Sequence, residues 1–107
     1  MHRGEVFTLP SPRGARGREQ RGERFGVVLQ ADELLSLSTV IVAPTSTRAR
    51  AASFRPEIDI AGTRTRVLVE QLGAVDPRRL GDSHGLISHD ELRAVERASL
   101  VVLGLQR

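Results

Sequence analysis

The chain has 107 residues, of which 39% are hydrophobic and 27% charged, and this length predicts one domain spanning 1–107. It has no cysteine, which excludes disulfides and thiolate metal sites, and no apolar run approaches the ~20 residues that span a bilayer. Because the N-terminus also lacks the apolar stretch of a secretory signal, the sequence predicts a cytoplasmic protein.

The charge is unevenly distributed. All 16 basic side chains are arginine, and against 13 acids they give a formal net charge of +3. This excess alone does not indicate nucleic acid, and the arginine usage also fits a GC-rich genome. Six arginines nevertheless fall within residues 1–24, where such a concentration could bind phosphates. The only aromatic residues are three Phe, so a base-stacking platform of the RRM or OB-fold type is not expected.

Short apolar runs alternate with polar segments along the chain. Strands are predicted at 3–9, 25–30, 38–45, 54–60, 65–72 and, briefly, at Leu86-Ile87. Polar loops are predicted at 10–24 and 46–53, and turns at 31–37, 61–62 and 76–80. Pro56 indicates that the strand at 54–60 lies at a sheet edge, because proline cannot donate to a central ladder.

The last predicted element is a helix over 88–104. Ser88 and Glu91 have the spacing of a capping box, apolar residues recur at helical intervals after them, and Gly104 ends the pattern. Strands followed by one terminal helix predict a small, strongly bent antiparallel sheet or barrel with the helix packed on it.

Several short motifs occur in a specific order. They are Arg3-Gly4-Glu5-Val6, Gly17-Arg18-Glu19-Gln20-Arg21-Gly22-Glu23-Arg24, Val27-Val28-Leu29-Gln30, Thr39 to Thr47 (TVIVAPTST), Val67-Leu68-Val69-Glu70-Gln71, Val75-Asp76 and Arg79-Leu80. This ordered set, which covers nearly the whole chain, resembles the MazF/PemK (Kid) family of toxin endoribonucleases. The resemblance implies a mainly β, SH3-like barrel with a C-terminal helix. It also implies a homodimer, a cognate MazE-like antitoxin, and cleavage of single-stranded RNA without a metal or other cofactor.

The chain departs from the family pattern at four places. Phe25 stands where proline is usual, and Ala31 where a small polar residue is usual. Gly73 and Ala74 occupy a stretch that usually carries a basic residue, so one expected phosphate contact is missing. Leu68 replaces an arginine of the Kid-type proteins and matches the MazF-type branch better.

Metal-free RNA cleavage uses the 2′-hydroxyl as nucleophile, and the protein must stabilise the extra charge on phosphorus. Arg24, at the end of the 10–24 loop, is the first candidate, because a guanidinium matches phosphate oxygens and its high pKa makes it a poor base. The alternative is that Arg24 is one solvated loop arginine among five.

Ser46 aligns with the family's functional threonine and Thr47 with the serine that follows it. The hydroxyl of Ser46 could bind a phosphate oxygen or orient the 2′-hydroxyl, or it could simply form a turn. Glu70 is the candidate general base or a group that orients the substrate, with a pKa raised by desolvation at the end of a strand. Its alternative role is as the structural partner of an arginine such as Arg3.

Further residues are candidates for RNA contacts. They are Arg18, Glu19, Gln20, Arg21, Thr47, Arg48, Arg50 and Gln71. The three histidines show no pairing, and the sequence has no His/Asp/Glu cluster with metal-ligand spacing. Two other function classes stay open: a CcdB-like toxin that binds a protein such as gyrase, and a non-catalytic RNA-binding barrel of the ribosomal type.

Overall fold

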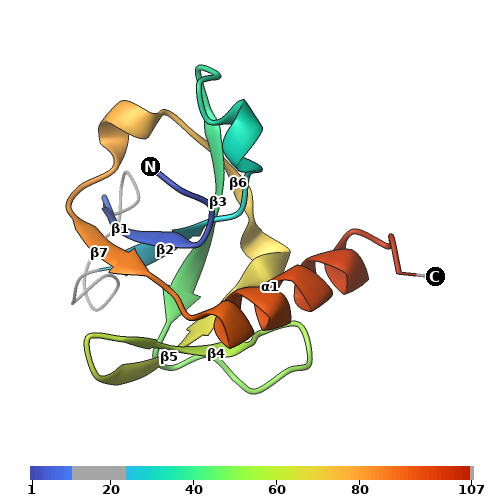
Figure 1. Cartoon of the computed structure of the whole chain (residues 1–107). Coiled ribbons are helices and arrows are strands. Elements are labelled where there is room, and N and C mark those ends of the chain that lie inside the picture. Colours follow the sequence, from blue (N-terminus) through green and yellow to red (C-terminus); the bar gives the residue numbers. More distant parts are fainter. Residues whose placement is uncertain (11–23, 107) are drawn as a thin grey trace.

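The structure, a computed structural model of the chain, describes residues 1–10 and 24–106. In this part, seven strands form one sheet in the order β4-β5-β3-β2-β1-β7, with β6 also paired to β3 (Figure 1). The strands are β1 (Glu5–Leu9), β2 (Arg24–Val28), β3 (Val40–Ser46), β4 (Glu57–Ile60), β5 (Thr63–Val67), β6 (Gly73–Val75) and β7 (Ser83–Leu86). The other elements are the 3-10 turns η1 (Asp32–Leu34), η2 (Val69–Gln71) and η3 (Pro77–Arg79), and the helix α1 (His89–Val102).

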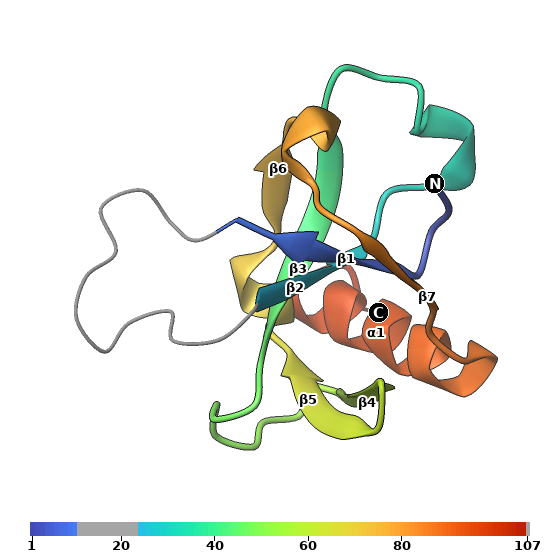
Figure 2. The same cartoon turned by 90° about the vertical axis from the view of Figure 1, so that its left-hand side faces the viewer.

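β3 is the strand that joins the parts of the sheet. One of its edges pairs with β2, and its other edge pairs with β6 near its start and with β5 at its end. Between these two partners the chain turns through η2, and the N–H of Leu68 donates to the carbonyl of Pro44 at 2.8 Å. The sheet bends around α1, so that α1 lies between the part formed by β1 and β2 and the part formed by the β4–β5 hairpin (Figure 2). The predicted mainly β barrel with a C-terminal helix is confirmed.

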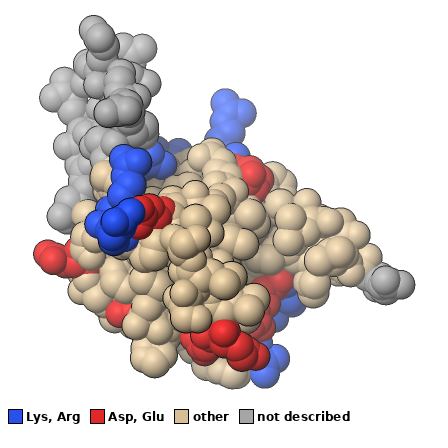
Figure 3. All heavy atoms as spheres, turned by 90° about the horizontal axis from the view of Figure 1, so that it is seen from above, with Lys and Arg blue, Asp and Glu red and all other residues tan. Residues whose placement is uncertain are grey.

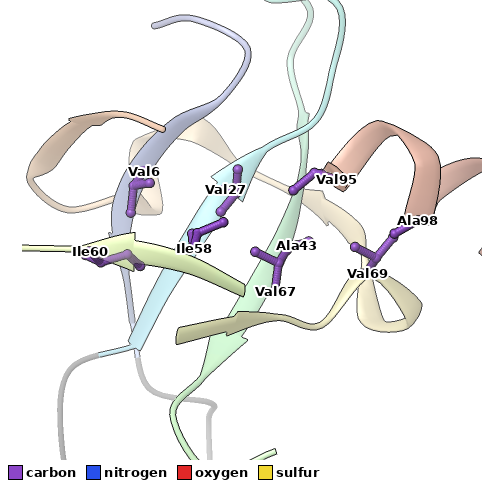
Figure 4. Packing of buried hydrophobic residues seen from close by; sticks show 9 residues of the cluster. All are labelled: Val6, Val27, Ala43, Ile58, Ile60, Val67, Val69, Val95 and Ala98. Carbon is purple, nitrogen blue, oxygen red and sulfur yellow. The ribbon is translucent and has the colours of Figure 1, made fainter. Parts of the chain in front are cut away.

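Aliphatic side chains of modest size fill the core. The larger cluster lies between the sheet and α1, where its members point toward one another (Figure 4): Val6, Val27, Ala43, Ile58, Ile60, Val67, Val69, Val95 and Ala98. A smaller cluster, Val28, Val40 and Val42, lies on the opposite face of the same strands. Both clusters follow from period-2 alternation, since successive residues of a strand point to opposite faces.

One predicted strand is wrong in its extent. The sequence predicted a continuous strand over 65–72, whereas β5 ends at Val67 and the chain passes through η2 before β6, a strand that was not predicted. A short apolar run such as 67–69 fits a buried turn as well as a buried strand, so periodicity could not separate them. Glu70 and Gln71 therefore lie in a turn.

Two other predictions about the sheet hold. The strand predicted at 54–60 begins only at Glu57, but it does form a sheet edge, with Pro56 just outside it. Ala61 and Gly62 form the predicted turn, and both have positive φ (52° and 87°), as the tight hairpin that joins β4 to β5 requires.

The predicted capping box of the helix is present. Ser88 Oγ accepts the N–H of Glu91 at 3.1 Å, and Glu91 Oε1 accepts the N–H of Ser88 at 2.9 Å. The other carboxylate oxygen of Glu91 accepts the N–H of Asp59 at 2.8 Å, which ties the start of α1 to β4. Beyond the helix, Gly104 adopts the positive φ (70°) that favours glycine.

Replacing Ser88 by alanine should lower the free energy of unfolding by about 1 kcal/mol, because an N–H at the start of α1 loses its acceptor. Urea denaturation measures this loss. Ser88→Asp is the control, since aspartate caps helices equally well and should keep most of the stability. An equal loss in both variants would contradict the capping explanation.

Candidate functional site

Arg24 and Ser46 lie at the same end of the sheet, where β2 begins and β3 ends. These strands pair with Gly26 opposite Pro44 and Val28 opposite Val42. Arg24 and Ser46 each lie two residues beyond the last pair of this ladder, where Arg24 is paired with Leu9 of β1 and Ser46 with Arg66 of β5. Because side chains alternate between the two faces of a strand, Arg24 and Ser46 are assigned to the same face as Val28 and Val42. Arg24 is thus the first residue of a strand and not, as predicted, the end of a loop, so the sheet holds its backbone in place.

The hydroxyl of Ser46 organises the loop that follows β3. Its Oγ accepts the backbone N–H groups of Arg48 and Ala49, each at 3.1 Å. Because a hydroxyl has two acceptor lone pairs and one donor, these contacts leave the O–H as its remaining hydrogen-bonding group. Ser46 is therefore both a turn-forming residue and a donor suited to an anionic oxygen.

Arg66 extends this arrangement and was not recognised from the sequence. Arg66 is on β5, where it is paired with Ser46 of β3 on one side and with Glu57 of β4 on the other. Ser46, Arg66 and Glu57 thus form a cross-strand row, one residue from each of three neighbouring strands, and Arg24 begins β2 at the Ser46 end of that row. The arginine–threonine alternation at 63–66 was the available signal, but it does not reveal which strand lies alongside.

Glu57 holds the outer end of the cross-strand row. Its carboxylate contacts the guanidinium of Arg64, and its Oε2 lies 3.0 Å from Arg66 Nη2. The hydrogen bond and charge of Arg64, followed by the charge of Arg66, lower the pKa of Glu57 below its usual value of 4.5. Glu57 is therefore ionised at neutral pH and partly neutralises the positive charge beside Ser46.

Glu70 differs from the prediction in both partner and pKa. Arg55 donates to its Oε2 from Nε at 3.0 Å and from Nη2 at 2.7 Å. The hydrogen bond from Arg55 lowers the pKa of Glu70 and outweighs the effect of burial, so the predicted rise is wrong. Its arginine partner is also not Arg3, which forms an ion pair with Glu96 on α1.

The remaining predicted RNA-contact residues fall into two groups. Thr47, Arg48 and Arg50, in the loop after β3, are exposed, and so is Gln71 at the end of η2. Arg18, Glu19, Gln20 and Arg21 lie outside the described residues. A view from above (Figure 3) shows a largely uncharged surface on which the described charged side chains form separate groups.

In the part of the chain that is described, the histidine and acidic side chains form no candidate metal site. No three His, Asp or Glu side chains there lie close enough together to hold a metal ion. His84 Nε2 lies 2.9 Å from Thr8 Oγ1, and its ring packs edge-on against Phe25 at 4.8 Å. These contacts connect β7 to β1 and β2. Across 1–10 and 24–106, α1 is too short and too polar to cross a membrane, and no other segment forms a membrane-spanning helix.

The Arg55–Glu70 contact should make stability depend on pH. Because the folded-state pKa of Glu70 is lowered, its contribution is present above the unfolded value near 4.5 and is lost as the pH falls through the folded value. The stability difference between wild type and Glu70→Gln should therefore shrink below about pH 4.5, as urea denaturation between pH 7 and 3 would show.

Asp76 provides the comparison for this pH series. The Arg78 side chain and backbone N–H lower its pKa to about 2, so the effect of Asp76→Asn should persist to lower pH than that of Glu70→Gln. A Glu70→Gln difference that stays constant down to pH 3 would contradict the assignment.

Comparison with known proteins identifies the family of this chain. A family model described as PemK-like, MazF-like toxin of type II toxin–antitoxin system matches residues 2–103. A toxin candidate of Mycobacterium tuberculosis (strain H37Rv) is 39% identical over 104 residues, covering 96% of this chain and 97% of the relative.

Solved structures share the fold at low sequence identity. A mycobacterial endoribonuclease in complex with its cognate antitoxin superposes with a TM-score of 0.81 at 16% identity, covering 100% of this chain and 98% of its own. MazF from Deinococcus radiodurans gives a TM-score of 0.76 at 22% identity, covering 97% and 96%. The M. tuberculosis toxin MazF-mt6 also gives 0.76, at 16% identity, covering 98% and 100%. The chain belongs to the PemK-like, MazF-like toxins of type II toxin–antitoxin systems.

Proposed function

We infer that this toxin is an endoribonuclease that cleaves single-stranded RNA at the Arg24–Ser46 end of the cross-strand row. The observation that supports this is the register of β2 and β3: continued beyond Gly26 and Pro44, its alternation assigns the Arg24 guanidinium and the Ser46 hydroxyl to one face, at the same end of the two strands. Both groups are hydrogen-bond donors that suit phosphate oxygens. The mycobacterial structural neighbours described as endoribonucleases support the same activity.

In this mechanism the 2′-oxygen of the RNA gives up its proton and bonds to the adjacent phosphorus. The bond from that phosphorus to the 5′-oxygen breaks, and the 5′-oxygen takes up a proton, which leaves a cyclic phosphate and a 5′-hydroxyl end. Arg24 stabilises the charge that develops on the phosphate oxygens, and the Ser46 O–H donates to one of them. Arg48, Arg50 and Thr47 contact the RNA backbone beside them. The general-base role of Glu70 stays a prediction and is not used in this mechanism. Its carboxylate already accepts two hydrogen bonds from Arg55.

The proposed partners follow from the family and its structural neighbours. Solved neighbours include an endoribonuclease bound to its cognate antitoxin and a MazE–MazF complex from D. radiodurans. We expect this toxin to bind a MazE-like antitoxin that blocks its RNA site, and to act as a homodimer.

The first experiment is incubation of the wild-type protein with a long single-stranded RNA in excess EDTA, with the product ends mapped. Discrete cuts that leave cyclic phosphate and 5′-hydroxyl ends are expected. Absence of cuts from folded protein would contradict the proposal and favour a toxin that binds a protein, or, if RNA is bound in a salt-sensitive way, a non-catalytic RNA binder.

A further inference from the structure

The loop from Thr47 to Pro56 carries three of the proposed RNA contacts and connects β3 to β4. Its first turn is fixed by the hydroxyl of Ser46, which accepts the N–H groups of Arg48 and Ala49. That anchor does not reach Arg50, whose side chain is exposed. A loop of this length therefore needs a second attachment if its cations are to keep a fixed position.

Arg55 provides that attachment through three kinds of contact. Two of its guanidinium nitrogens donate to Glu70 Oε2, and the third, Nη1, donates to the backbone carbonyl of Arg50 at 3.2 Å. The guanidinium carbon also lies 5.5 Å from the centre of the Phe54 ring, within cation–π range. One side chain thus joins the middle of the loop to η2.

The Arg55–Glu70 pair is partly shielded from water, which strengthens its hydrogen bonds. The side chains of Arg55 and Glu70 are only 25% and 26% exposed, unlike the surface pair of Arg78 and Asp76, where the arginine is 89% exposed. Charge-assisted hydrogen bonds are stronger than neutral ones, and partial burial reduces screening by water and salt. This pair is therefore expected to hold the loop more firmly than a surface ion pair would.

The same residue connects the loop to the proposed site. The carbonyl of Arg55 accepts a hydrogen bond from Arg66 Nη1 at 3.4 Å, and Arg66 stands beside Ser46 in the cross-strand row. Because this bond uses the backbone of Arg55, replacing the Arg55 side chain should release the loop cations and leave the row in place.

We propose that Arg55 is a positioning residue that clasps the 47–56 loop onto Glu70, and that Glu70 serves RNA binding through Arg55 rather than as a general base. This rests on the proposed function, because the loop is held for contact with RNA. The arrangement differs from the sequence-based prediction, in which Glu70 removes a proton. The two roles predict different kinetics for the same substitutions.

The test compares Arg55→Gln, Glu70→Gln and the double variant. Steady-state cleavage of a short RNA in EDTA separates turnover from substrate binding. The clasp predicts that each single variant raises KM about tenfold, the scale of one charge-assisted hydrogen bond, while turnover changes less than about threefold. It also predicts that the double variant is no worse than either single one, because both substitutions break the same contact.

Two further variants sharpen the comparison. Arg55→Lys keeps the positive charge but not the fork that joins Glu70 to the Arg50 carbonyl, so an intermediate KM is expected. Arg78→Gln removes a bidentate arginine–carboxylate pair elsewhere, and its KM should equal that of wild type. Circular dichroism confirms that each variant is folded.

Amide hydrogen exchange of residues 47–56, measured without RNA, tests the clasp independently of cleavage. Arg55→Gln and Glu70→Gln should both speed exchange there and leave β3 unchanged. If the wild-type protein cleaves no RNA, the proposed function fails. Even then, faster exchange of residues 47–56 in the two variants supports the clasp, and unchanged exchange overturns it.

If wild type does cleave RNA, the kinetics can also overturn the clasp. A general base is expected to contribute about 100-fold or more to turnover. A loss of that size with Glu70→Gln but not with Arg55→Gln would therefore return the proton-removing role to Glu70. Additive losses in the double variant would equally contradict a shared contact.

Discussion

Arg24→Ala is expected to reduce RNA cleavage by at least about 100-fold, the scale seen when one preorganised donor to a developing oxyanion is removed. Arg24 begins β2, and its pairing with Leu9 of β1 holds its backbone in place. Single-turnover cleavage in EDTA measures the loss. The effect should appear in the rate at saturating protein, because the lost interaction forms chiefly in the transition state.

Two variants control this result. Arg93→Ala removes an exposed arginine of α1 and should cleave like wild type. Arg24→Lys keeps the charge without the planar fork and should retain only part of the activity. Wild-type cleavage by folded Arg24→Ala protein would remove Arg24 from the mechanism.

Val67→Ala is expected to lower the free energy of unfolding by about 2–3 kcal/mol, from two lost methyl groups and the cavity that they leave. Val67 is fully buried (0% exposed) in the larger core cluster and is paired with Thr45 on β3. Against the roughly 5–15 kcal/mol typical of a domain, this is a large share, and it should appear as a lower urea midpoint with an unchanged m-value.

Val101→Ala is the matched control, since the same two methyl groups are removed from a side chain that is 46% exposed on α1. Alanine also has the higher helix propensity, so little stability should be lost. Equal losses at the two positions would show that burial of Val67 in the larger core cluster is not what stabilises the fold.

Local patterns in the sequence predicted most of the fold. The apolar runs located β1, β2 and β3, Pro56 placed β4 at an edge, and Ser88 with Glu91 marked the start of α1. Each of these signals depends on residues within about one turn or one strand of each other. Prediction was wrong at 65–72, because a short apolar run fits a buried strand and a buried turn equally well.

The site was predicted less completely. Arg24 and Ser46 were identified from their motifs, and they lie at the start of β2 and the end of β3, two strands that pair with each other. Arg55 and Arg66 were missed, because neither belongs to a motif and each acts through partners supplied by folding. The predicted rise in the pKa of Glu70 was wrong for the same reason, since burial was inferred without the arginine that offsets it.

The sequence by itself determined the class of fold and the order of its elements through periodicity and caps, and its resemblance to the MazF/PemK family indicated the two side chains on which the proposed chemistry depends. The tertiary structure alone decided which charges meet. Glu70 and Arg55 are 15 residues apart in sequence, and Arg3 and Glu96 are 93 apart. Such pairs depend on the paths of intervening loops and strands. The Coulomb energy between two charges, and the pKa shift that it causes, decrease as the charges move apart. The role of a charged side chain is therefore fixed only once its neighbours are in place.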